Sequence, residues 1–231
     1  MLLWIYFHFS FEKYGKINLA DFISYVEGKK GNKLADEEVT KAMIKALYFQ
    51  RCGMDLEEKY AGPYTHKACH NLPAYLLTDP SFIVEDVSGG WHDAGDHIKF
   101  NLTIGFALSS LGISDYINPG IYEKAGCRDH LEYEMRWGAD YLMKTTFLDD
   151  SGKVVAVAHT VADGGTDHSF WSSPEVQTYE RPIFWLTAND NNSSVSCEMA
   201  AGLCAAAYVF KDSDPEYSAK CAKYAKALLE F

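Results

Sequence analysis

The sequence predicts an all-α protein in which helices are joined by long loops. Apolar residues recur at helical spacing in five separate segments, and there is neither an internal repeat nor the strand and helix alternation typical of a parallel sheet. Hydrophobic residues make up 48% and charged residues 23% of the 231 residues, as in a chain that buries a core. This composition argues against disorder.

The helices are expected in a definite order. The first covers residues 36–52, where Asp36 can cap the N-terminus, acidic residues follow in the first turn, and Gly53 ends the helix. In the third helix, expected at residues 131–144, one side carries a stripe of apolar residues, Leu131, Met135, Ala139 and Leu142. The remaining helices are expected at residues 102–111, 196–210 and 215–231.

Two long segments between these helices are expected to be loops, residues 54–100 and residues 145–194. The first contains three prolines and the pair Gly89 and Gly90. Loops of this length in a compact protein are usually functional. We therefore expect the chemistry to lie in them.

Charge and aromatic content narrow the class of partner. The net charge of −11 disfavours nucleic acid and acidic membranes, and no apolar run approaches the eighteen residues of a membrane span. Aromatic residues make up 14% of the chain, enough to suggest a use beyond the core, such as sugar binding. A neutral substrate is expected.

Residues 1–33 carry no pattern that assigns them to a domain. Their apolar start, residues 1–9, lacks the preceding basic residues and the small-residue cleavage site of a clear signal peptide. The alternatives are a signal peptide and a strand remaining from a preceding domain.

The segment from Gly89 to His97 holds two aspartates, Asp93 and Asp96, separated only by small residues. A tight turn there can aim both carboxylates at one point and hold a water, as the base half of an acid and base pair would require. Spacing alone leaves two alternatives, an aspartate-capped turn and a site for a hard cation.

A second group of residues has the composition of a closed structural zinc site. Two thiols and two imidazoles supply it: Cys52, Cys69, His70 and His92. His66 and His97 compete for the fourth position, and the spacing is not that of a standard finger. The alternative is that Cys52 is a buried helix residue and the histidines are exposed. The other four cysteines are expected to be small buried hydrophobes: Cys127, Cys197, Cys204 and Cys221.

The turn also carries a family resemblance. Residues 88–100, Ser-Gly-Gly-Trp-His-Asp-Ala-Gly-Asp-His-Ile-Lys-Phe, resemble the hallmark of glycoside hydrolase family 9, the endoglucanases and related cellulases. Further stretches resemble family segments in the same order, at residues 46–53, 135–144, 167–175 with 180–182, and 198–218. The resemblance covers residues 34–231 and implies the N-terminal part of the family's catalytic domain.

That resemblance implies an inverting hydrolase of β-1,4-glucosidic bonds in cellulose or β-glucan oligosaccharides. The implied fold is a partial (α/α)6 toroid of six helical hairpins, incomplete at the C-terminus. Asp96 matches the general base and Asp93 the carboxylate that positions the attacking water, while His168 and Trp171 match residues that bind glucan. Without the family, His168 would more often be a surface or core histidine and Trp171 a packed loop anchor. Tyr179 and Trp185 are weaker candidates.

Several further expectations rest on the family. The matching general acid, a glutamate near the end of the family's catalytic domain, is not found, so this chain alone is expected to hydrolyse cellulose negligibly. An incomplete toroid would also leave helix faces without partners, so an exposed strip of apolar residues is expected. The alternatives are a non-catalytic β-glucan-binding module and a zinc-stabilised helical module. The resemblance agrees with zinc, allows calcium in the full-length family at no residue assignable here, and implies secretion.

Overall fold

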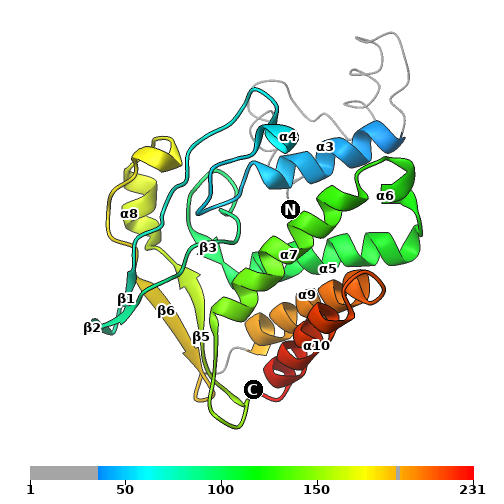
Figure 1. The fold of residues 1–231 in the computed structure, drawn as a ribbon. Coiled ribbons are helices and arrows are strands. Elements are labelled where there is room, and N and C mark those ends of the chain that lie inside the picture. The colour runs from blue at the N-terminus through cyan, green and yellow to red at the C-terminus, as the bar shows by residue number, and fades with distance from the viewer. Residues whose placement is uncertain (1–35, 191–192) are drawn as a thin grey trace, which may run out of the picture.

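The five expected helices are present in a computed structural model of the chain, which describes residues 36–190 and 193–231 (Figure 1). The first ends at Tyr48, a few residues before the expected end, and Gly53 lies beyond it with a positive φ of 91°. The long helices are α3 (Asp36–Tyr48), α5 (Asn101–Ile117), α7 (Arg128–Lys144), α9 (Ser193–Phe210) and α10 (Pro215–Leu229). Shorter helices are α4 (Glu58–Ala61), α6 (Ile121–Lys124), α8 (Gly164–Ser169) and the 3-10 helix η1 (Pro174–Val176).

The expectation of an all-α fold, and with it the partial toroid built only of helical hairpins, is wrong. Each segment expected to be a loop contributes three strands to one six-stranded sheet, in the order β2-β1-β6-β5-β3 with β4 also pairing with β5. The β1 and β6 pair is parallel and the other pairs are antiparallel. The strands are β1 (Ala74–Leu76), β2 (Asp79–Val84), β3 (Lys99–Phe100), β4 (Thr146–Leu148), β5 (Val154–Val161) and β6 (Ile183–Thr187).

Three of the six strands, β1, β3 and β4, have at most three residues, too few to show a period of two. The longest, β5, is buried along most of its length, so its valine-rich sequence shows no alternation of apolar and polar residues. In Figure 1 the long helices lie together on one side of the molecule, and β1, β2, β5 and β6 lie on the other. The fold is therefore a helical layer packed beside a mixed sheet.

The predicted apolar stripe of α7 is confirmed. Leu131, Met135, Ala139 and Leu142 are all fully buried, at 0% exposure, in the main hydrophobic core. This core joins α7 to α5, α9 and α10, and it includes Trp91, which directly precedes the segment with the two aspartates.

Helices α5 and α9 pack unusually closely, and glycines allow it. A Cβ atom on Gly105 would lie 2.6 Å from the backbone oxygen of Glu198, and one on Gly112 would lie 2.6 Å from the Cβ of Ala205. Any larger side chain at these positions would push the helices apart. By length and composition alone α9 could cross a membrane, but half of it is buried in this fold, as in a core helix.

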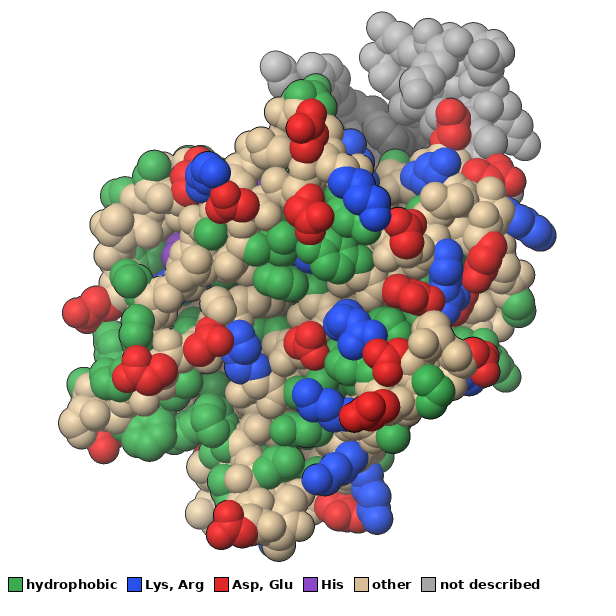
Figure 2. Space-filling model, in the orientation of Figure 1, with side chains coloured by type: hydrophobic (Ala, Val, Ile, Leu, Met, Phe, Trp, Pro, Cys, Tyr) green, Lys and Arg blue, Asp and Glu red, His purple; other side chains and the backbone are tan. Residues whose placement is uncertain are grey.

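Surface features agree in part with the sequence. On the face drawn in Figure 2, acidic and basic side chains are interspersed, and no single basic patch gathers on that face.

Of the four cysteines expected to be buried, Cys127 and Cys221 are buried, whereas Cys197 and Cys204 are exposed because they lie on the outer side of α9. The apolar start of the chain and the capping role of Asp36 lie outside the described side chains.

Candidate active site

The segment expected to carry the catalytic aspartates is a tight turn between Trp91 and β3. The backbone N–H of Asp93 donates to the carbonyl of Ile98 at 2.9 Å, and that of Asp96 donates to the carbonyl of Asp93 at 3.2 Å. Ala94 adopts a φ of 55°, in the left-handed region that residues with a side chain seldom occupy. These contacts hold both carboxylates on one short loop.

Asp96 forms a pair with His168. One carboxylate oxygen, Oδ2, lies 3.0 Å from His168 Nε2, and the other, Oδ1, accepts from the backbone N–H of Ile98 at 3.2 Å. The hydrogen bond with Asp96 raises the pKa of His168 above its ordinary value. The structure therefore brings together two residues that the sequence placed in separate roles, as a base and as a sugar ligand.

Asp93 occupies a different environment. Burial raises its pKa above the ordinary aspartate range, and the nearby charge of Asp96 adds to the effect, while a hydrogen bond from Thr103 opposes it. Thr103 lies in the first turn of α5. Unequal environments of this kind allow two neighbouring carboxylates to serve different functions.

Trp171 lies over the turn with its ring in solvent. Its side chain is 76% exposed, and a Cβ atom on Gly95 would lie 3.7 Å from its ring. A packed loop anchor would be buried, so that alternative does not fit Trp171. Trp171 also lines a small hollow between the two loops. The residues around it are Gly95, Asp96, His97, Asp167, His168, Phe170, Trp171, Ser172 and Gln177.

Asp167 is a site residue that the sequence reasoning missed. It is 3% exposed, and its carboxylate accepts from the backbone N–H of His97 at 3.1 Å and from the hydroxyl of Tyr179. Arg181 lies 3.8 Å from the same carboxylate and donates to the carbonyl of His97. His97, the residue after Asp96, is thus hydrogen-bonded to Asp167, the residue before His168. This bond holds Asp96 and His168 in position to pair. The available signal was the position of Asp167 directly before His168.

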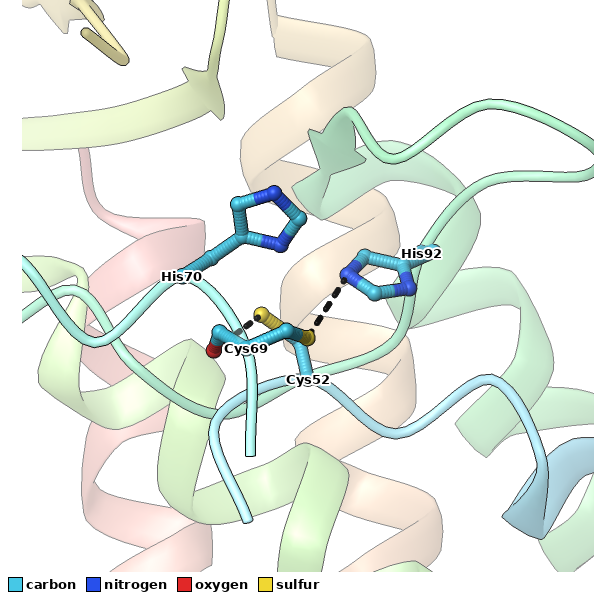
Figure 3. A group of neighbouring side chains, drawn as sticks. All are labelled: Cys52, Cys69, His70 and His92. Carbon is cyan, nitrogen blue, oxygen red and sulfur yellow. Dashed lines mark hydrogen bonds between the residues drawn. The ribbon is translucent and has the colours of Figure 1, made fainter. Parts of the chain in front are cut away.

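The four residues expected to hold zinc lie together, as Figure 3 shows. One ligand atom from each of Cys52, Cys69, His70 and His92 lies within 4.8 Å of the others. Cys69 Sγ is 3.7 Å from His92 Nε2. The sequence alternative of exposed histidines does not hold for His92, which is 7% exposed.

The two competing histidines lie outside this group of four. His66 turns its Nδ1 to the carbonyl of Lys67, at 2.9 Å. The centre of the His97 ring lies 4.9 Å from the centre of the His92 ring, but His97 contributes no ligand atom to the group of four. Cys52, Cys69, His70 and His92 are therefore the set that the geometry favours.

The chemistry of these donors fits a zinc ion. Burial lowers the pKa of His92 to about 4, so its imidazole is neutral at pH 7, as a ligand must be. The hydrogen bond with Cys69 lowers the pKa of Cys52 well below that of a free thiol and raises that of Cys69. The Nδ1 atom of His70 is buried and has no hydrogen-bond partner among the described residues. Two thiols and two imidazoles that converge in this way are a common structural zinc set.

A buried ion pair supports both the metal group and the turn. Arg51 and Glu134 are both 0% exposed and lie 3.2 Å apart, and Glu134 also accepts from the indole N–H of Trp91 at 3.0 Å. Arg51 precedes Cys52, and Trp91 precedes His92. The backbones of these two segments are bonded to one another, since Cys52 N–H donates to the carbonyl of Gly90 at 3.0 Å.

Lys99 is a second buried charge that the sequence did not reveal. Its ammonium donates to the carbonyls of Val87 and Gly89 and lies 4.6 Å from the centre of the Tyr141 ring. Complete burial lowers the pKa of Lys99 to about 8. These bonds tie the entry of the turn to the first residue of β3.

Comparisons with known proteins agree with one another. The sequence profile described as Glycosyl hydrolase family 9 matches residues 37–231. Endoglucanase B of Cellulomonas fimi is 37% identical over 155 residues, 67% of this chain and 14% of that protein. Endoglucanase 10 of rice, Oryza sativa subsp. japonica, is 36% identical over 219 residues, 90% of this chain and 34% of that protein.

Solved structures give the same result. The catalytic domain of Clostridium thermocellum CelT superposes with a TM-score of 0.74 at 34% identity, over 84% of this chain and 43% of that one. The cellulase Cel9M of C. cellulolyticum in complex with cellobiose superposes with a TM-score of 0.73 at 27% identity, over 84% of this chain and 43% of that one. The chain thus spans less than half the length of these relatives. With a profile match over most of its residues, the chain belongs to glycosyl hydrolase family 9.

Proposed function

We propose that this chain contributes the base side of an inverting hydrolase of β-1,4-glucosidic bonds in cellulose or β-glucan oligosaccharides. The observation that carries the proposal is the turn that presents Asp96 beside His168 and beneath the exposed ring of Trp171. The solved relative that holds cellobiose supports the class of ligand. Export from the cell is part of the proposal, since the substrate is a polymer.

In this proposal, Asp96 accepts a proton from the attacking water. Both of its oxygens already accept one hydrogen bond, but a carboxylate oxygen has a second lone pair, so a water can still bind. Asp93, on the same turn, helps to orient that water. His168 fixes the rotamer of Asp96 and donates to sugar hydroxyls, and Trp171 offers its face to the C–H surface of a glucose ring.

Inversion also requires a carboxylic acid on the opposite side of the bond, about 6.5–9.5 Å from the base. We assign that acid to no residue of the described chain. The 231 residues alone are therefore expected to bind glucan but to release negligible reducing sugar from carboxymethylcellulose.

We further propose that Cys52, Cys69, His70 and His92 hold a structural zinc ion. Bound there, zinc would supply a cross-link and no chemistry of the reaction, because all four of its positions would be taken by protein. Its ligands come from the segment that follows α3, from the loop before β1, and from the start of the catalytic turn. Calcium has no site that we assign.

Glucan binding is tested by calorimetric titration of the chain with a soluble cello-oligosaccharide. Trp171→Ala is expected to weaken binding about fivefold, since a stacked aromatic face is worth about 1 kcal/mol. Tyr116→Ala is the matched control, because Tyr116 is also an exposed aromatic, at 67%, but lies at the far end of α5 from the turn.

The glucan-binding site and the role of Asp96 as the base can be refuted separately. Equal loss of affinity in both variants, or no binding by the unsubstituted chain, would overturn the glucan site. Binding that survives Asp96→Asn, together with unchanged turnover in a longer chain that completes the domain, would refute Asp96 as the base and leave a glucan-binding module.

A further inference from the structure

Gln177 connects the metal group to the loop that carries the glucan-binding residues. It follows η1, and its side chain is buried, at 8% exposure. Its amide oxygen lies 3.1 Å from His70 Nε2, and its amide nitrogen donates to the carbonyl of Phe170 at 3.0 Å. Phe170 lies between His168 and Trp171 in the chain.

The chemistry of the two partners determines which way the amide points. A backbone carbonyl can only accept, so the NH₂ group must face Phe170, and the amide oxygen must then face His70. An amide oxygen can only accept, so His70 carries its proton on Nε2. That leaves the lone pair on Nδ1, the buried atom that lacks a partner among the described residues.

We propose that Gln177 is a positioning residue that sets the tautomer of His70 for metal binding and couples the metal to the loop of His168 and Trp171. This inference rests on the zinc site proposed above. A ligand histidine whose other nitrogen is held by a hydrogen-bond acceptor is the usual arrangement around protein-bound metals. A metal on His70 would immobilise the ring, and through it Gln177 and the carbonyl of Phe170.

The loop at the far end of this connection has few other restraints. His168 is 61% exposed and Trp171 is 76% exposed. Among the described contacts, Phe170 is held by its own N–H to the carbonyl of Asp167 at 3.1 Å, by an edge contact of its ring with that of Tyr179, 6.1 Å between centres, and by the bond from Gln177. Losing the second bond is therefore expected to loosen the segment that carries the sugar-binding side chains.

Two substitutions separate the two bonds of Gln177. Gln177→Leu removes both and keeps similar volume, whereas Gln177→Glu keeps an acceptor for His70 and loses the donor to Phe170. Thr178→Ala is the matched control, because Thr178 is the neighbouring residue on the same loop and is exposed.

The first measurement is zinc affinity, by competition between the metal-free full chain and a chromophoric chelator at pH 7. Gln177→Leu is expected to weaken zinc binding about 10- to 100-fold, the usual effect of losing such a partner. Gln177→Glu and Thr178→Ala are expected to stay within about threefold of the unsubstituted chain, because the acceptor on His70 remains.

The second measurement is hydrogen exchange of peptides from residues 168–177, with and without zinc. Zinc is expected to slow exchange there in the unsubstituted chain and in Thr178→Ala. It is expected to have no such effect in Gln177→Glu, even though that variant binds zinc.

The outcomes distinguish the inference from its premise. A chain that binds no zinc overturns the metal site and the inference together. Zinc binding that is as tight in Gln177→Leu as in the unsubstituted chain overturns only the role of Gln177 in metal binding. Zinc that binds but leaves exchange at residues 168–177 unchanged overturns only the coupling to the loop.

Discussion

The buried pair of Arg51 and Glu134 allows a sharp prediction about what holds the site together. Glu134→Gln keeps the size and one acceptor oxygen of the side chain but removes its charge. Arg51 is then left as a positive charge with 0% exposure and no carboxylate at 3.2 Å. Removing one partner of a buried ion pair usually costs about 3–5 kcal/mol of unfolding free energy.

The geometry gives a similar magnitude. Two unit charges 3.2 Å apart at an effective dielectric constant of about 20 attract by about 5 kcal/mol. Two effects reduce the loss: the glutamine oxygen still accepts a bond, and the guanidinium of Arg51 also lies over the rings of Tyr133 and Trp137, at 3.8 and 4.6 Å. We therefore expect Glu134→Gln to lower the free energy of unfolding by about 3 kcal/mol.

The same helix provides the control. Glu132→Gln is the identical substitution two residues earlier in α7, where the partner is Arg128 at 2.9 Å and both side chains are partly exposed, at 26% and 29%. Solvent screening limits such a pair to about 0.2–1 kcal/mol. Equilibrium unfolding in urea at pH 7 measures both variants. If Glu134→Gln lies within 1 kcal/mol of Glu132→Gln, the buried charge does not hold the site as argued.

Three further predictions follow. In histidine NMR titrations, His168 should titrate above the ordinary value of about 6.5, staying protonated to higher pH, and Asp96→Asn should return its pKa toward that value; equal pKa values in both proteins would contradict the pairing. Phe106, at 49%, is one of several exposed apolar side chains on α5, so Phe106→Gln should reduce concentration-dependent association in sedimentation, and an unsubstituted chain that stays monomeric would contradict it. Gly138→Ala would place a Cβ within 2.5 Å of two atoms of the Trp91 ring, so overpacking of about 1–3 kcal/mol should outweigh the gain of about 1 kcal/mol in helix propensity, and a stabilised variant in urea unfolding would contradict it.

The helices were predictable because their signal is local. The stripe of Leu131, Met135, Ala139 and Leu142 repeats with the period of a helix, and all four residues are fully buried. Pro215 at the start of α10, behind the capping side chain of Asp214, is likewise a signal carried by adjacent residues. Such elements depend on neighbours a few positions away.

The sheet was not predictable by the same reasoning. Strand β1 has three residues and β3 has two, too few to show alternation. Strand β1 pairs with its neighbour β2, but both β1 and β3 also have a partner far away in the sequence, as when Leu76 pairs with Ile183 and Lys99 with Val161. Pairings over such separations follow from how the chain folds back, which no local pattern encodes.

The sequence by itself determined the chemistry that is available: two aspartates on a turn of small residues, a histidine and tryptophan on a second loop, and two thiols with two imidazoles. Only the tertiary structure decided which of these meet. It placed Asp96 against His168, 72 residues apart, and His70 against Gln177, 107 residues apart. It also buried the side chain of Asp167 where it clamps His97. The physical reason is that residue type and local spacing are written along the chain, whereas distance and burial depend on the packing of segments that are remote in sequence.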